Sequence, residues 1–133
     1  MKKHGPSKFL YPGLKVCDAE VHAMARAWIK FELQSPQGMS KAEEALTYGA
    51  VNNPAENFRV IREICRRTKD SDLLVKVGVC LLEELLAYSA HKIIRKLSAE
   101  LRHNMSFRKA FKHAYVTQRD KGYRATKILA KEL

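Results

Sequence analysis

Residues 71–88 are apolar on nearly every side when they are drawn as a helix. Only Lys76, Glu83 and Ala87 form a polar strip along it. The remaining circumference is covered by Leu74, Val75, Val77, Gly78, Val79, Leu81, Leu82, Leu85 and Leu86. A helix that is apolar nearly all round is a buried one. Other helices must therefore surround this segment, and we expect Leu81 and Leu85 at the centre of the core.

Helix signals on both sides of this segment predict an all-α chain. Ser40 with Glu43 is a capping box, and Asn53 before Pro54 predicts a helix start. The expected helices cover about 18–33, 40–49, 54–67, 71–88 and 91–103, with another from Ser106 onward. No stretch alternates between apolar and polar residues as a strand does. We expect a compact bundle of five to seven helices around a buried central helix at about 71–88.

A length of 133 residues is that of one domain. Residues 1–16 contain two glycines and two prolines without an apolar period, which predicts an irregular arm that packs, if at all, through Phe9, Leu10 and Tyr11. The helical domain is expected over 17–116. The basic tail over 117–133 leaves two alternatives open, a short docked helix or an unattached segment.

The same residues indicate a soluble protein of the cytoplasm. The N-terminus lacks the apolar stretch of a signal peptide, and no run approaches the roughly 20 apolar residues of a membrane span. Three cysteines, Cys17, Cys65 and Cys80, cannot all pair within one chain and form no close motif. We therefore expect reduced thiols and no contact with a membrane.

The charge of the chain is concentrated in its last third. Residues 91–133 hold twelve lysines and arginines against Glu100, Asp120 and Glu132, whereas residues 1–90 hold thirteen against eleven acidic residues. Spacing predicts that the basic residues of 91–103 lie opposite the apolar ones, and a second basic face follows from Ser106. The candidate binding residues are Lys92, Arg95, Lys96, Arg102, Arg108, Lys109, Lys112 and Arg119.

Catalytic motifs are missing from the sequence. No phosphate-binding glycine loop, nucleophile elbow or metal-ligand spacing is present, so we expect no enzyme activity, no cofactor and no metal. Glu84 falls inside the apolar arc of 71–88, where an unpaired carboxylate is costly to bury. We expect a structural ion pair with Arg62, Arg66 or Arg95, which we favour over a role for Glu84 as a functional acid.

Five short segments, taken in order along the chain, form a pattern that resembles a known family. They are Ala27-Trp28-Ile29, Val60 to Ile64, Leu82 to Leu86, Ile93-Ile94 and Phe107 to Phe111. In this order the chain resembles a family of small bacterial helical domains of unknown function over about residues 19–116. The turn that this family builds with Gly-Pro is here Cys80-Leu81. The resemblance implies a bacterial all-α domain and carries no activity.

The basic third is the strongest functional lead in the sequence. We expect a non-enzymatic helical binding module whose cationic C-terminal third contacts an acidic protein partner. Nucleic-acid binding by the same face is the first alternative, because Tyr123 lies among basic residues and bases stack on aromatic rings. An enzyme that the motifs do not reveal is a more distant alternative.

Overall fold

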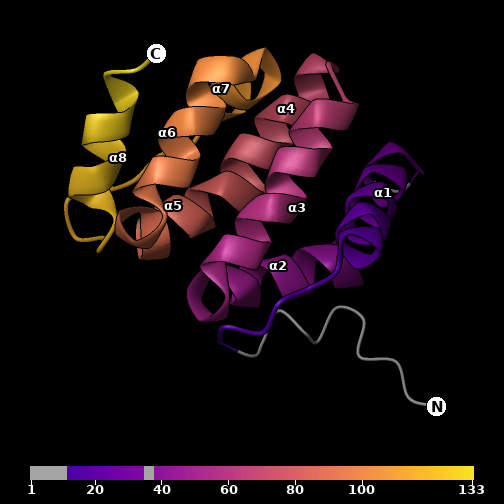
Figure 1. The fold of residues 1–133 in the computed structure, drawn as a ribbon. Coiled ribbons are helices and arrows are strands. Elements are labelled where there is room, and N and C mark those ends of the chain that lie inside the picture. The colour runs from indigo at the N-terminus through magenta and orange to yellow at the C-terminus, as the bar shows by residue number, and fades with distance from the viewer. Residues whose placement is uncertain (1–11, 35–37) are drawn as a thin grey trace.

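A computed structural model describes residues 12–34 and 38–133 (Figure 1). Every regular element in these residues is helical, so the predicted all-α fold is confirmed. The elements are α1 (Asp18–Gln34), α2 (Lys41–Asn52), α3 (Pro54–Arg67), α4 (Ser71–Lys76), a π-helical segment (Val77–Leu82), α5 (Glu83–Ser89), a 3-10 turn (Ala90–Lys92), α6 (Ile94–His103), α7 (Met105–Phe111) and α8 (Tyr123–Ala130). The helices form a bundle that runs from α1 at one end to α8 at the other (Figure 1).

Side-chain caps begin three of these helices. The Ser40 hydroxyl accepts a hydrogen bond from the Glu43 amide at 3.0 Å, as the capping box predicts. Asp70 and Asn104 accept from amides in the first turns of α4 and α7. Asn53 behaves differently, because its side-chain amide donates to the carbonyl oxygen of Leu14 at 2.7 Å and does not cap α3. Asn53 therefore ties the N-terminal segment to the start of α3.

The core lies between α1, α3, α5 and α7. Trp28 of α1 is fully buried, and the rings of Phe58 and Phe107 meet edge to face with centroids 5.9 Å apart. Leu81 and Leu85 are buried as predicted. α3 contacts α1, α2, α5, α7 and the π-helical segment. The core is therefore built around two helices, α3 and the helix that contains residues 71–89.

The helix over 71–89 is less buried than the sequence predicts. α4 and α5 are joined by the π-helical segment, in which the Glu83 amide donates to the carbonyl of Gly78 five residues earlier. The side chains of Val75 and Val79 are 37% and 49% exposed. The prediction of a helix surrounded on all sides is wrong for this one face, because none of the other helices in residues 12–34 and 38–133 covers it.

Two glycines let helices approach closely. A Cβ atom on Gly78 would lie 2.2 Å from the carbonyl oxygen of Ala110, which places α7 directly against the π-helical segment. A Cβ atom on Gly122 would lie 1.7 Å from the carbonyl oxygen of Leu86. The Gly122 amide also donates to the carbonyl of Ala87 at 2.9 Å. The start of α8 is thereby fixed against α5.

The C-terminal residues form a docked helix, the first of the two alternatives for the tail. Ala125 and Leu129 of α8 are buried in the core cluster, whereas Ile128 remains largely exposed. At the other end of the chain, Val16 is buried and its amide donates to a Glu56 carboxylate oxygen at 3.0 Å. The residues expected to anchor the N-terminal arm, Phe9, Leu10 and Tyr11, lie outside the described residues.

Candidate binding surface

The basic residues of the C-terminal third project from the outer faces of α6, α7 and α8. Each helix turns a small apolar set inward: Leu97 and Leu101 from α6, Phe107 from α7 and Leu129 from α8 are all buried. Helical spacing then places the charged positions on the opposite, solvent-facing side. The sequence pattern alone therefore predicts which side of each helix carries the basic residues.

Seven of the eight candidate binding residues are exposed: Lys92, Arg95, Lys96, Arg102, Lys109, Lys112 and Arg119. Arg108 is half-buried and has a different position. Its guanidinium donates to the backbone carbonyls of Leu101 at 3.2 Å and Glu132 at 2.9 Å. Arg108 therefore links α7 to α6 and to the segment after α8, and contributes less to the outer surface than its seven companions.

The acidic residues of this third do not neutralise the surface. The Glu100 side chain is only 7% exposed and receives two hydrogen bonds from Arg66 of α3, at 3.0 and 3.2 Å, and one from Asn104 at 2.7 Å. Asp120 accepts from the Thr117 amide within the loop before α8. Among the described residues, Arg102 alone of the twelve cations in 91–133 forms an ion pair with a carboxylate, that of Glu132.

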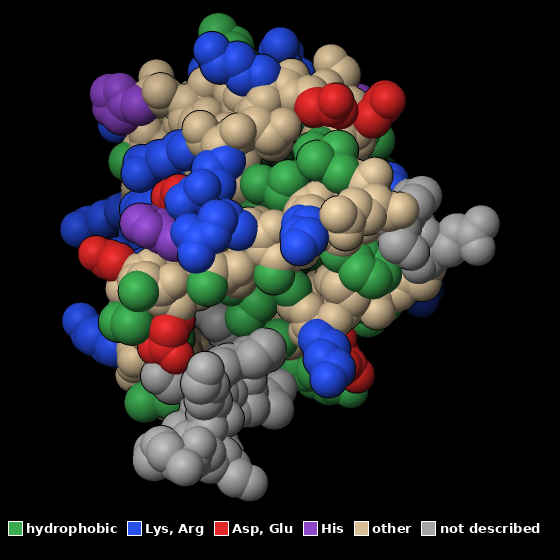
Figure 2. Space-filling view, turned by 90° about the vertical axis from the view of Figure 1, so that its right-hand side faces the viewer, with side chains coloured by type: hydrophobic (Ala, Val, Ile, Leu, Met, Phe, Trp, Pro, Cys, Tyr) green, Lys and Arg blue, Asp and Glu red, His purple; other side chains and the backbone are tan. Residues whose placement is uncertain are grey.

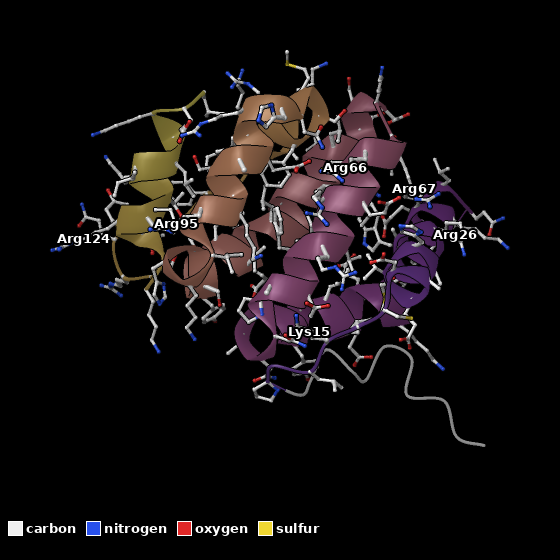
Figure 3. The ribbon with its side chains drawn as sticks, in the orientation of Figure 1. Lys15, Arg26, Arg66, Arg67, Arg95 and Arg124 are labelled. Carbon is white, nitrogen blue, oxygen red and sulfur yellow. The ribbon has the colours of Figure 1, made fainter. Side chains whose placement is uncertain are left out.

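A groove runs between α6 and α8. It encloses about 290 Å³ and is lined by Ile94, Arg95, Ser98, Arg102, Ile128, Leu129 and Glu132. Ile94, Leu129 and the 56% exposed Ile128 give it apolar walls. Figure 3 shows Arg95 and Arg124 at this end of the bundle, on the two neighbouring helices. The groove thus combines an apolar lining with a cationic border.

Glu132 occupies part of this groove. Its carboxylate accepts hydrogen bonds from the Ser98 hydroxyl and from the Arg102 guanidinium, whose Nε lies 3.0 Å away. These two bonds to the charged form lower the pKa of Glu132 below its ordinary value. The groove therefore already holds one carboxylate of the same chain.

The ion pair expected at Glu84 is absent from the part of the chain that the structure describes, so this prediction is wrong. Arg66 binds Glu100, Arg62 lies over the Phe58 ring, and Arg95 lies at the α6–α8 groove. Glu84 is half-buried, and burial together with the nearby Glu83 and Asp120 carboxylates raises its pKa. The carboxylate thus remains in a partly buried acidic environment.

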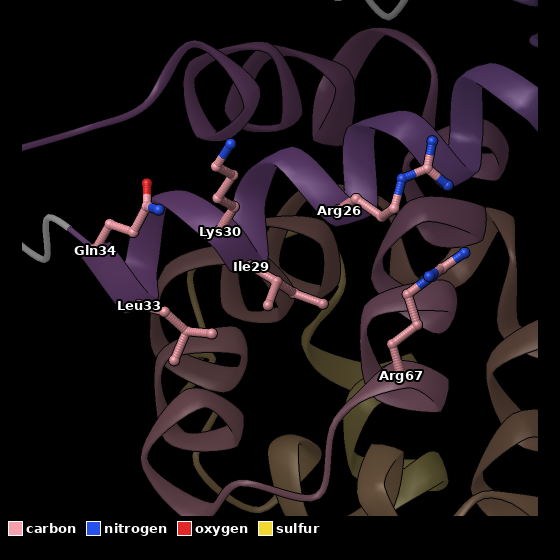
Figure 4. A pocket seen from close by; sticks show the side chains of 6 residues that line it. All are labelled: Arg26, Ile29, Lys30, Leu33, Gln34 and Arg67. Carbon is pink, nitrogen blue, oxygen red and sulfur yellow. The ribbon is translucent and has the colours of Figure 1, made fainter.

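A second cationic region, which was not predicted from the sequence, lies at the opposite end of the bundle. Arg26 and Lys30 of α1 and Arg67 of α3 line a pocket of about 530 Å³ with Ile29 and Leu33 (Figure 4). Figure 2 shows basic side chains gathered beside hydrophobic ones on the face that α1 forms. The residues come from two helices that only the fold brings together. The net charge of residues 1–90 is close to zero, so the composition gave no sign of this cationic region.

Thiol and aromatic chemistry find little support in this structure. Burial, with a smaller contribution from Glu100, raises the pKa of the Cys65 thiol to about 12, and burial also raises that of Cys80. A raised pKa disfavours the reactive thiolate. Phe107 and Phe111 are buried, so they offer no stacking surface. Among the described residues, no three His, Cys, Asp or Glu side chains gather as metal ligands would.

Comparisons give no further assignment. None of the described helices combines the length and apolar character needed to cross a lipid bilayer. The chain matches no family model, no curated protein and no solved structure.

Proposed function

We propose that this protein is a non-enzymatic helical binding module that contacts an acidic protein partner through the cationic surface of α6, α7 and α8. The observation that supports this proposal most is the lack of internal neutralisation. Glu100 is turned inward to Arg66, and most cations of the surface have no carboxylate partner among the described residues. A surface of one sign attracts and orients a partner of the opposite sign.

The groove between α6 and α8 favours a protein partner over nucleic acid. Its walls include Ile94 and Ile128, which suit an apolar side chain of a polypeptide. Nucleic-acid binding by stacking needs free aromatic faces. Tyr123 is half-buried and its ring is covered by the Lys127 ammonium, 5.7 Å from the ring centroid. We therefore propose an acidic polypeptide as the ligand and treat single-stranded DNA as a competing outcome.

The experiment compares two double charge reversals at opposite ends of the bundle. Arg95→Glu with Lys109→Glu alters the proposed surface, and Arg26→Glu with Lys30→Glu is the matched control with the same change in net charge. All four side chains are exposed, so both variants should melt close to the wild type. Binding to poly-L-glutamate and to single-stranded DNA is measured at low and moderate salt.

We expect the first variant to lose most poly-L-glutamate binding and the control to keep most of it. Equal losses would mean that net charge alone drives binding and would refute the proposed surface. Tight binding of single-stranded DNA with weak binding of poly-L-glutamate at the same salt would instead establish the nucleic-acid alternative. Salt should weaken binding in either case, since counterions compete for exposed charges.

A further inference from the structure

The position of the Glu132 carboxylate shows which kind of chemical group the α6–α8 groove binds. Ser98 and Arg102 lie one turn apart on α6, and both donate to the Glu132 carboxylate. Arg108 reaches the same segment from α7 through the Glu132 carbonyl oxygen. A hydroxyl and a guanidinium directed at one carboxylate form a strong charge-assisted arrangement. The groove is thus preorganised for a carboxylate beside an apolar lining.

The segment that carries Glu132 is held to α6 and α7 through Glu132 itself, by the bonds from Ser98, Arg102 and Arg108. It follows the last residue of α8, and its backbone is held by single-turn bonds, from the Glu132 amide to the Leu129 carbonyl at 2.9 Å and from the Leu133 amide to Ala130 at 3.2 Å. Leu133 is exposed, whereas Leu129 anchors α8 in the core. The segment after Leu129 can therefore lift while α8 stays docked, since the last turn of a helix frays at low cost.

We infer that Ser98 and Arg102 form a carboxylate-binding site that the chain's own Glu132 occupies, and that an acidic side chain of the partner displaces Glu132 from it. This inference rests on the proposed function and adds to it the position at which the partner's carboxylate binds. Glu132 then acts as an internal competitor. The apparent affinity for the partner is the intrinsic affinity of the open site multiplied by the fraction of molecules in which the site is open.

The test uses fluorescein-labelled hexaglutamate as the probe and anisotropy as the measurement. Glu132→Gln removes the competing charge, and Glu44→Gln, an exposed position on α2, is the control with the same change in net charge. We expect Glu132→Gln to bind about threefold tighter or more, the gain for a site open less than a third of the time. The control should change binding far less. Arg102→Gln should abolish the gain when it is combined with Glu132→Gln.

A second measurement follows the displacement directly. The side-chain carboxyl carbon of Glu132, observed by NMR in the full chain, should move toward the position of a free glutamate as hexaglutamate is added. Binding without any change at Glu132, or equal affinities of Glu132→Gln and Glu44→Gln, would overturn the inference and leave the proposed function intact. Failure of the wild type to bind either hexaglutamate or poly-L-glutamate would instead refute the proposed function.

Discussion

Replacing Gly122 by alanine should destabilise the protein, although alanine is the better residue for the local backbone. Gly122 has φ −87° and ψ 6°, torsions that alanine adopts without strain. If only the local backbone mattered, the change would raise the free energy of unfolding by about 0.4–1 kcal/mol, because alanine has fewer backbone conformations than glycine in the unfolded chain. The new Cβ, however, would lie 1.7 Å from the carbonyl oxygen of Leu86, where ordinary contact begins at 3.4 Å. The backbone segments must separate, and neither can rotate away as a side chain would.

The expected cost follows from this separation. Overpacking of this kind costs about 1–3 kcal/mol. Loss of the hydrogen bond from the Gly122 amide to the Ala87 carbonyl adds about 1 kcal/mol. After the local gain is subtracted, we expect a loss of about 2 kcal/mol in the free energy of unfolding. For a chain of 133 residues the unfolding entropy is about 0.28 kcal/mol per kelvin, so the melting temperature should fall by about 7 °C.

The assay is thermal and urea denaturation followed by circular dichroism. Ala27→Gly, at an exposed position inside α1, is the control, because it weakens a helix by about 1 kcal/mol without altering the contact between α8 and α5. If Gly122→Ala melts within about 2 °C of the wild type, or above it, then α8 does not approach α5 as closely as described and the steric reasoning is wrong.

Two further predictions concern the helix over 71–89. Leu85→Ala should lower the free energy of unfolding by about 4 kcal/mol, since the side chain is fully buried, and Val79→Ala, on the exposed face, by less than about 1 kcal/mol; similar losses in urea denaturation would contradict the described burial. Glu84→Gln should raise stability at pH 7 by a few tenths of a kcal/mol, a small value because the side chain is only half-buried. Burial raises the pKa of Glu84, so the charged carboxylate is the form that destabilises the protein at pH 7. The gain from Glu84→Gln should therefore vanish near pH 3.5, where the carboxyl is protonated in both the folded and the unfolded chain. If Glu84→Gln instead lowers the stability at pH 7, Glu84 must have a cationic partner.

Local signals in the sequence predicted the helices well. Caps such as Ser40 depend on residues within one turn, and the apolar spacing of Leu97 and Leu101 fixes which side of α6 faces the core. The exposure of Arg95, Lys96 and Lys109 follows from the same periodicity. These features needed no knowledge of which helices are neighbours.

Features that depend on neighbouring helices could not be read in this way. The wheel for 71–88 placed Glu84 by assuming an uninterrupted α-helix, but the π-helical segment before it changes the phase of the helix. The pocket beside Arg26 requires that α1 and α3 lie side by side. The hydrogen bonds of Glu132 to α6 form only because α8 docks on α6. The composition of the basic tail did not decide between a docked helix and an unattached segment.

The π-helical segment also gives this helix one place at which it can lose a residue without changing the direction of the side chains that follow. A π-helical turn holds more residues than an α-helical one, and such a segment is equivalent to a residue inserted into a regular helix. Deleting one residue within 77–82 would let the hydrogen bonds return to the α pattern at little local cost. All later positions would then keep their direction relative to α4, so that Leu85 and Leu86 would stay in the core, whereas a deletion within α4 or the first turn of α5 would rotate them by about 100°. A loss of one residue should therefore be tolerated in the loop over 112–122 and within 77–82, and selected against in the α-helical parts of this helix.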